Sequence, residues 1–365
     1  MEIQAINILD GQAYAYHLAD GQVSPLAEVN TDIYAGPGLC DVQVNGFGGI
    51  DVNDITLTTE KMEDLARKER AEGVTSFMPT VITNSGEAIS QLMQILARSI
   101  AGSEIVKAAV CGIHLEGPFI SPEDGPRGAH AREYVTAPNW DLFMQWQEAA
   151  QGHIRLVTLS PEWEGSAAFI EKCVANNIRI AIGHTNATHQ QIVEAVQAGA
   201  SMSTHLGNGM HNILPRHPNY LWSQLAEDDL YCSVIADGFH VPAEVLKVFM
   251  KIKKDKLFLV SDSTAFAGMA PGNFHTHIGG DVTLTGKGRL HLTANPATLA
   301  GSAVSMLDCV AFMVKEGLMT AAEAWMAGSV MPRKYLDQGK EPLGGNIHDD
   351  LVFFSLADGD CRLIG

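Results

Sequence analysis

Short apolar runs alternate with amphipathic segments through the centre of the chain. Runs rich in apolar or β-branched residues predict eight strands, near 37–46, 74–82, 109–117, 154–160, 178–184, 201–206, 231–237 and 257–262. The segments between these runs have the period and the end signals of helices. Eight strand–helix alternations predict a parallel sheet, and this number suits a closed barrel. The predicted fold class is therefore α/β, with a (β/α)8 TIM-like barrel.

Several helix ends are marked by their residue types. Thr188 and Gln191 have the spacing of a capping box, an apolar stripe follows them, and Gly199 ends the segment. Pro242 opens another amphipathic segment, and a second capping box is expected at Thr320. An open doubly wound sheet is the rival fold. No GxGxxG motif follows the first predicted strand, which counts against a dinucleotide-binding sheet.

Both ends of the chain have a different pattern. Residues 1–37 are strand-like with a turn at Asp10-Gly11, and the apolar stretch 351–354 precedes another turn at Asp358-Gly359. Because isolated hairpins bury little surface, we expect the two ends to pair with each other. The sequence thus predicts a small β-sandwich domain from residues 1–37 and 336–365. It flanks a barrel of residues 38–335, with an inserted hairpin at 273–298.

Composition narrows the choice of partners and of compartment. With 46% apolar and 18% charged residues the chain can fill a large core, and its net charge of −18 disfavours nucleic acid and anionic membranes. The negative net charge does not exclude a phosphorylated substrate, because a local cluster of Arg and His can attract the phosphate at contact range despite a distant negative surface. The six cysteines are scattered without a CxxC pair, and no apolar stretch has the length of a membrane span. We therefore expect a soluble cytoplasmic protein.

Acidic residues and histidines lie at the ends of several predicted strands. Glu116 ends the third, His184 the fifth, His205 the sixth and Asp262 the eighth, and His240 follows the seventh. In a barrel all carboxyl ends of the strands meet at one face, where active sites lie. The pattern predicts that these side chains converge.

The convergent set suits metal-assisted hydrolysis. Glu116, His184 and His205 are suitable ligands for Zn²⁺ or another divalent ion, which lowers the pKa of water and polarises a carbonyl. Asp262, outside the ligand set, can take the proton of the water and pass it to the leaving amine. A single strand-end His is more often a hydrogen-bonded core residue, and Asp262 alone could cap a helix. The joint occurrence favours the metal site.

These motifs carry a family resemblance over nearly the whole chain. In chain order, the sequence resembles the N-acetylglucosamine-6-phosphate deacetylases of the amidohydrolase superfamily at 37–46 (PGLCDVQVNG), 114–119 (HLEGPF), 183–185 (GHT), 204–206 (THL), 236–240 (ADGFH) and 261–264 (SDST).

The resemblance implies a metal-dependent barrel enzyme that hydrolyses an N-acetyl group to acetate and an amino sugar, in amino-sugar catabolism. It assigns Glu116, His184 and His205 as the metal ligands and proton transfer to Asp262. Many amidohydrolases have His-x-His on the first strand, which helps to hold a second metal. Here Gln43 and Asn45 occupy those positions, as in family members with one metal. We therefore expect one divalent ion per chain, with Zn²⁺ favoured and Fe²⁺ or another ion open.

The resemblance also implies substrate contacts. It assigns sugar, carbonyl or phosphate contacts to His130, Asn208, Gly209, Arg216 and His240. Family members often take the Arg from a second subunit, which implies a homodimer. An insertion before His130 and altered flanks of Arg216 depart from the family pattern. N-acetylgalactosamine-6-phosphate and an unphosphorylated N-acetylhexosamine therefore stay open as substrates.

Two other functions are alternatives. An amidohydrolase for cyclic amides or dipeptides commonly uses His-x-His and a bridging lysine on strand four. This chain has neither, because strand four, at 154–160, contains no Lys. A non-catalytic binding protein is expected to have lost Glu116, His184, His205 or Asp262, and all four are present.

Overall fold

Eight parallel strands form the centre of the molecule. The computed structural model of the chain describes all residues except 20, 28, 277–279, 339–349, 358–359 and 365. The strands pair in the order β14-β13-β12-β11-β10-β9-β8-β5, and a parallel bridge between Val44 and Ser263 joins the two outer strands. The predicted (β/α)8 barrel is confirmed. Its strands are β5 Leu39–Val44, β8 Val74–Ile82, β9 Ile113–Glu116, β10 Ile154–Leu159, β11 Arg179–Ile182, β12 Met202–Ser203, β13 Tyr231–Ile235 and β14 Leu257–Val260.

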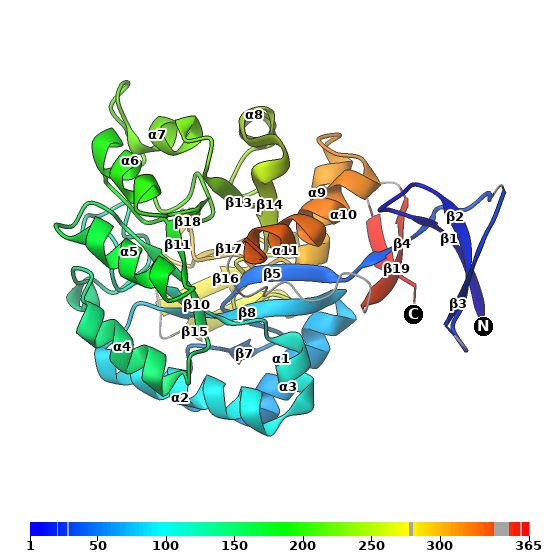
Figure 1. The fold of residues 1–365 in the computed structure, drawn as a ribbon, viewed down its shortest axis with the longest axis horizontal. Coiled ribbons are helices and arrows are strands. Elements are labelled where there is room, and N and C mark those ends of the chain that lie inside the picture. The colour runs from blue at the N-terminus through cyan, green and yellow to red at the C-terminus, as the bar shows by residue number, and fades with distance from the viewer. Residues whose placement is uncertain (20, 28, 277–279, 339–349, 358–359, 365) are drawn as a thin grey trace.

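Helices surround these strands on the outside (Figure 1). Because both faces of a barrel strand are covered, apolar residues predominate in the strands, and every residue of β5 is buried, its polar Asp41 and Gln43 included. The helices are α1 Thr59–Ala71, α2 Gly86–Gly102, α3 Glu104–Ala109, α4 Trp140–Ala149, α5 Ser166–Ala175, α6 His189–Gln197, α7 Tyr220–Ala226, α8 Ala243–Lys253, α9 Met306–Lys315, α10 Ala321–Gly328 and α11 Val330–Leu336, with 3₁₀ turns at Arg132–Tyr134 and Lys254–Lys256.

The predicted helix ends are confirmed. Thr188 forms the capping box of α6 with Gln191, and Thr320 forms that of α10 with Glu323. Pro242 is the N-cap residue of α8. In each capping box the side chains of both partners bind the other's backbone N–H, which satisfies donors that the first helical turn leaves unpaired.

The two chain ends share one sheet at the side of the barrel (Figure 1). Its order is β20-β19-β4-β1-β2-β3, a mixed sheet separate from the barrel that contains strands from both chain ends. The strands are β1 Glu2–Asn7, β2 Ala13–His17, β3 Gln22–Pro25, β4 Ile33–Pro37, β19 Leu351–Ala357 and β20 Asp360–Leu363. Phe354 of β19 stacks on Trp325 of α10, with ring centroids 3.6 Å apart, which docks this sheet on the barrel.

Part of the terminal prediction lies outside the described residues. The turn at Asp358-Gly359 and all of 339–349, within the predicted segment 336–365, lie outside the described residues. The domain boundaries at 37 and 336 therefore stay predictions.

The inserted segment after β14 is larger than the predicted hairpin. It forms a four-stranded antiparallel sheet, in the order β15-β16-β17-β18. A two-stranded hairpin is marginal in water, and the further strands let Val282, Leu284 and Leu290 bury a small apolar cluster. The strands are β15 Gly272–Thr276, β16 Gly280–Leu284, β17 Leu290–Leu292 and β18 Asn295–Leu299, and residues 277–279 lie outside the description.

Among the described residues, no helix combines the length and the apolar character that crossing a bilayer demands. All six cysteines are free thiols, and none is paired in a disulfide.

Candidate active site

Four of the predicted residues lie at the carboxyl ends of barrel strands. Glu116 is the last residue of β9, and His184, His205 and Asp262 each follow a strand by two residues. His184, His205 and Asp262 have positive φ angles of 48°, 29° and 47°. Such a conformation costs about 1–3 kcal/mol in a residue other than glycine, so the surrounding structure must hold it. Strained residues of this kind cluster at functional sites.

Glu116, His184 and His205 converge on one point. Glu116 Oε1 lies 2.9 Å from His205 Nε2 and 3.3 Å from His184 Nε2, and the two imidazole nitrogens lie 3.1 Å apart. Ligand atoms at the usual distances from a tetrahedral Zn²⁺ are separated by about 3.3 Å. The three atoms thus have the spacing of one face of such a coordination shell.

Hydrogen bonding of His184 fits the role of a ligand. Its Nδ1 donates to the carbonyl oxygen of Pro126 at 2.8 Å. In the neutral ring Nε2 then carries a lone pair, which faces another acceptor, Glu116 Oε1. Two acceptors at 3.3 Å repel each other unless a cation lies with them, and metal-ligating histidines commonly donate their other N–H to a carbonyl. The donor set therefore fits a divalent ion.

Gly209 also holds His184 in place. Its φ is +58°, and a Cβ at this position would lie 2.7 Å from His184 Nδ1. Only glycine permits this close approach.

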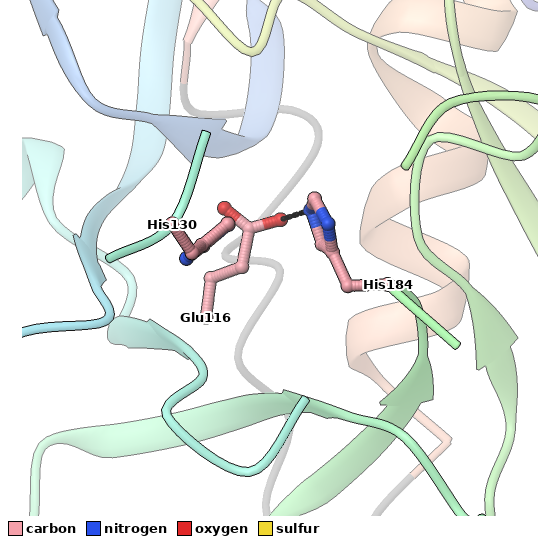
Figure 2. A group of neighbouring side chains, drawn as sticks. All are labelled: Glu116, His130 and His184. Atoms are coloured by element: carbon pink, nitrogen blue, oxygen red, sulfur yellow. Dashed lines mark ion pairs between the residues drawn. The ribbon is translucent and has the colours of Figure 1, made fainter. Parts of the chain in front are cut away.

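His130 extends the cluster on the other side of the carboxylate (Figure 2). The donor atoms of Glu116, His130 and His184 all lie within 4.8 Å of one another, so this trio too could hold a metal ion. His205 Nε2 nevertheless lies closer, at 2.9 and 3.1 Å from Glu116 and His184, so it also has the spacing of a ligand. Burial lowers the pKa of His130 to about 3, which keeps its ring neutral.

The two first-strand amides bind the two central carboxylates. Gln43 Nε2 donates to Glu116 Oε1 at 2.9 Å, and Asn45 Nδ2 donates to Asp262 Oδ1 at 2.7 Å. Each amide thus directs its NH₂ group, which cannot ligate a metal, toward the site. The arrangement agrees with a site for one ion.

Asp262 has an altered affinity for protons. Burial, with the nearby negative charge of Glu116, raises its pKa to about 6, while the Asn45 hydrogen bond acts in the opposite direction. A carboxyl group with a pKa close to the working pH both accepts and returns a proton efficiently.

A cavity of about 490 Å³ opens over this cluster. Among the predicted substrate contacts, His130, Asn208, Gly209 and His240 line it. Arg216 is exposed and lies outside the lining of this cavity. Within the described lining there is neither Lys nor Arg.

Some lining residues carried no sequence signal. Thr276 and residues 297–301, from the inserted sheet and the two residues that follow it, line the cavity. Thr83 also escaped prediction, and its hydroxyl lies 2.8 Å from His130 Nδ1. Asp237, which contacts His240, lies inside a motif that was recognised, and its spacing of three residues was the available signal.

A polar layer supports the site from inside the barrel. His114 Nδ1 donates to the Val42 carbonyl at 3.1 Å, and Nε2 lies 2.8 Å from Thr158 Oγ1, which contacts Thr204 Oγ1 at 2.7 Å. Burial lowers the pKa of His114 to about 4. This neutral, fully paired histidine fills the barrel beneath Glu116.

The fold and the site define a class of protein. A (β/α)8 barrel with one Glu and two His gathered at the carboxyl ends of its strands, beside an Asp, is the arrangement of the metal-dependent amidohydrolases.

Comparison with known proteins narrows the class. The chain is 35% identical to N-acetylglucosamine-6-phosphate deacetylase of Bacillus subtilis, over 74% of this chain and 67% of that protein. It is 31% identical to N-acetylgalactosamine-6-phosphate deacetylase of Escherichia coli O157:H7, over 87% and 84%. The crystal structure of N-acetylglucosamine-6-phosphate deacetylase from Pasteurella multocida matches with a TM-score of 0.83 and 26% identity, over 98% and 96%. No protein-family model matches the chain. The chain belongs to the N-acetylglucosamine-6-phosphate deacetylase family, and it is a hydrolase.

Proposed function

We propose that the chain hydrolyses the N-acetyl group of N-acetylglucosamine-6-phosphate, giving glucosamine-6-phosphate and acetate, in amino-sugar catabolism. The observation that carries the proposal is the convergence of Glu116, His184 and His205 in one cavity with Asp262. The relative from Bacillus subtilis, at 35% identity, is a deacetylase of this substrate.

In this proposal Glu116, His184 and His205 hold one divalent ion, with Zn²⁺ favoured and Fe²⁺ the alternative. When bound, such an ion supplies Lewis acidity, which polarises an amide carbonyl and makes water acidic near neutral pH. The orientation of Gln43 and Asn45 supports a single ion, because their NH₂ groups face the two carboxylates.

Asp262 moves the proton. As a carboxylate it takes a proton from water while the water oxygen bonds to the acetyl carbon. When the carbon–nitrogen bond breaks, the protonated carboxyl returns this proton to the leaving nitrogen, so the products are acetate and an amine. The pKa of about 6, raised by burial, supports both directions of transfer.

His130 binds the carbonyl oxygen. Its ring is neutral, and the Thr83 hydroxyl is placed to donate to Nδ1. An N–H then remains on Nε2, which donates to the oxygen as negative charge develops there.

Arg216 binds the 6-phosphate in the cavity of a second copy, and the enzyme is a cytoplasmic homodimer. Two observations support this part of the proposal: Arg216 is exposed, and the described lining of its own cavity holds no Lys or Arg. A guanidinium suits a phosphate because it makes paired, charge-assisted hydrogen bonds.

N-acetylgalactosamine-6-phosphate is the second candidate substrate, because a deacetylase of this epimer is 31% identical to the chain. An acetate-release screen of N-acetylglucosamine and N-acetylgalactosamine, each with and without the 6-phosphate, separates the candidates. We expect the highest kcat/KM for N-acetylglucosamine-6-phosphate. Higher kcat/KM for the galacto epimer would replace the first candidate, and no acetate from any of the four would overturn both.

A further inference from the structure

Asp237 accepts three hydrogen bonds, two from His240 and one from Phe239. Asp237 Oδ2 accepts from His240 Nδ1 at 2.6 Å, and Oδ1 accepts from the backbone N–H groups of Phe239 and His240, both at 2.8 Å. The side chains of Asp237 and His240 are only 2% and 10% exposed. Bonds from a charged carboxylate are stronger than neutral ones, and burial protects them from competing water.

The turn that carries both residues is fixed. Gly238, between them, has a φ of +75°, and a Cβ there would lie 2.6 Å from the ring of Phe312. Val241, the next residue after His240, is buried. The segment 237–241 therefore has little freedom to turn His240 another way.

Asp237 also stays charged. Burial alone would raise its pKa, but hydrogen bonds from the ring and the backbone of His240 hold the pKa below its usual value. A carboxylate at 2.6 Å selects the tautomer that carries its proton on Nδ1. In the neutral ring Nε2 is then an acceptor for the cavity that His240 lines.

We propose that Asp237 is a positioning residue, which fixes the orientation and tautomer of His240 so that Nε2 accepts a hydrogen bond from a sugar hydroxyl of the substrate. A hydroxyl suits this position better than phosphate, because the carboxylate offsets any positive charge on the imidazole. The inference rests on the proposed deacetylase function for the identity of the ligand, but the Asp237–His240 relationship holds without it.

The tautomer is measured on the full chain by NMR with ¹⁵N-labelled histidine. Several rings carry their proton on Nδ1, among them those of His114 and His184, whose Nδ1 atoms donate to backbone carbonyls. We expect that of His240 to have a strongly downfield proton resonance, which His240→Asn removes and thereby assigns. Asp237→Asn should lose that resonance and change the nitrogen shifts of His240. A wild-type His240 with its proton on Nε2 overturns the proposal, and this measurement needs no Asp237 variant to fold.

Asp281→Asn is the matched control. Asp281 accepts from His275 Nδ1 at 2.8 Å in the same way, but both side chains are more than three-quarters exposed and neither lines the cavity. This variant should leave the His240 resonance and the kinetic constants unchanged.

A double-mutant cycle tests whether Asp237 acts through His240. Asp237→Asn should raise KM about 10- to 100-fold, the effect of one strong hydrogen bond, with unchanged metal content and a smaller effect on kcat. In the His240→Asn background the same substitution should have no further effect. Additive losses would overturn the proposal. Acetate release by the wild type tests the deacetylase function separately. If the wild type releases no acetate, the tautomer measurement still tests whether Asp237 fixes His240.

Discussion

Asn45 donates from Nδ2 to Asp262 Oδ1 at 2.7 Å and so joins the end of the first barrel strand to the end of the eighth. This bond stabilises the charged form of Asp262, against the effects of burial and of Glu116. One amide thereby adjusts the proton affinity of the group to which we assign proton transfer.

Replacing Asn45 should move the pH dependence of catalysis. Asn45→Ala removes a bond to the charged carboxylate, so the pKa of Asp262 rises. Because the reaction begins with the carboxylate, the acid limb of kcat/KM should shift to higher pH, by about one pH unit. The measurement is kcat/KM from pH 5 to 9. A shift to lower pH would contradict the assignment of Asp262 as the base.

Asp262→Asn should retain the metal and lose turnover. The amide keeps the size of the side chain but cannot accept a proton from water, so kcat should fall at least about 10³-fold. Acetate release and metal content are measured on the same sample. Activity within about tenfold of wild type would show that another group transfers the proton.

Arg216→Ala should discriminate between phosphorylated and unphosphorylated substrates. Loss of a charge-assisted contact should raise KM for the 6-phosphate about 10- to 100-fold and leave the unphosphorylated sugar nearly unaffected. Arg132, which is also exposed and lies outside the cavity, provides the control variant Arg132→Ala. Equal losses for both substrates would remove the phosphate role.

Mixing two impaired variants, assayed with the 6-phosphate substrate well below the raised KM, tests whether Arg216 acts between subunits. Arg216→Ala and Asp262→Asn chains, mixed under conditions that exchange subunits, should form hybrid dimers with one complete site. Partial recovery of activity is the expected result. No recovery, with exchange verified by mass spectrometry, would place Arg216 in its own chain's site.

Asp41 should make the fold less stable at high pH. Burial raises its pKa to about 7, although it accepts hydrogen bonds from Ser261 and from the Gln43 N–H. The folded state therefore binds a proton that the unfolded state releases above pH ~4, and stability falls as pH rises from about 4 through 7.

Asp41→Asn should remove this loss. The free energy of unfolding is measured in urea at pH 5.5 and pH 8. It should fall with pH in the wild type and fall by about 2 kcal/mol less in the variant, because each pH unit between 5.5 and the pKa of about 7 contributes about 1.4 kcal/mol. Identical pH dependence in both proteins would show that Asp41 does not titrate in this range.

The residues at the centre of the site could be predicted because the end of a strand can be located from the sequence alone. Glu116, His184, His205 and Asp262 end apolar runs, and a parallel barrel aligns all such ends at one face. The capping boxes at Thr188 and Thr320 could also be predicted, because a few neighbouring residues determine each of them.

What the sequence could not predict depends on contacts between distant segments. Thr83 meets His130 only because two strand–helix connections lie side by side, and the inserted sheet reaches the cavity only through the packing of the whole barrel. The two additional strands of that sheet were missed because short, polar strands such as Asn295–Leu299 have no clear period.

The most direct test of the account is the number of metal ions per chain, measured by elemental analysis of the purified wild type, of His205→Ala and of the substrate-contact control Asn208→Ala. We predict about one divalent ion in the wild type and in Asn208→Ala, and well under one in His205→Ala. About two ions per chain would contradict a single-ion site, and an unchanged content in His205→Ala would contradict the assignment of His205 as a ligand.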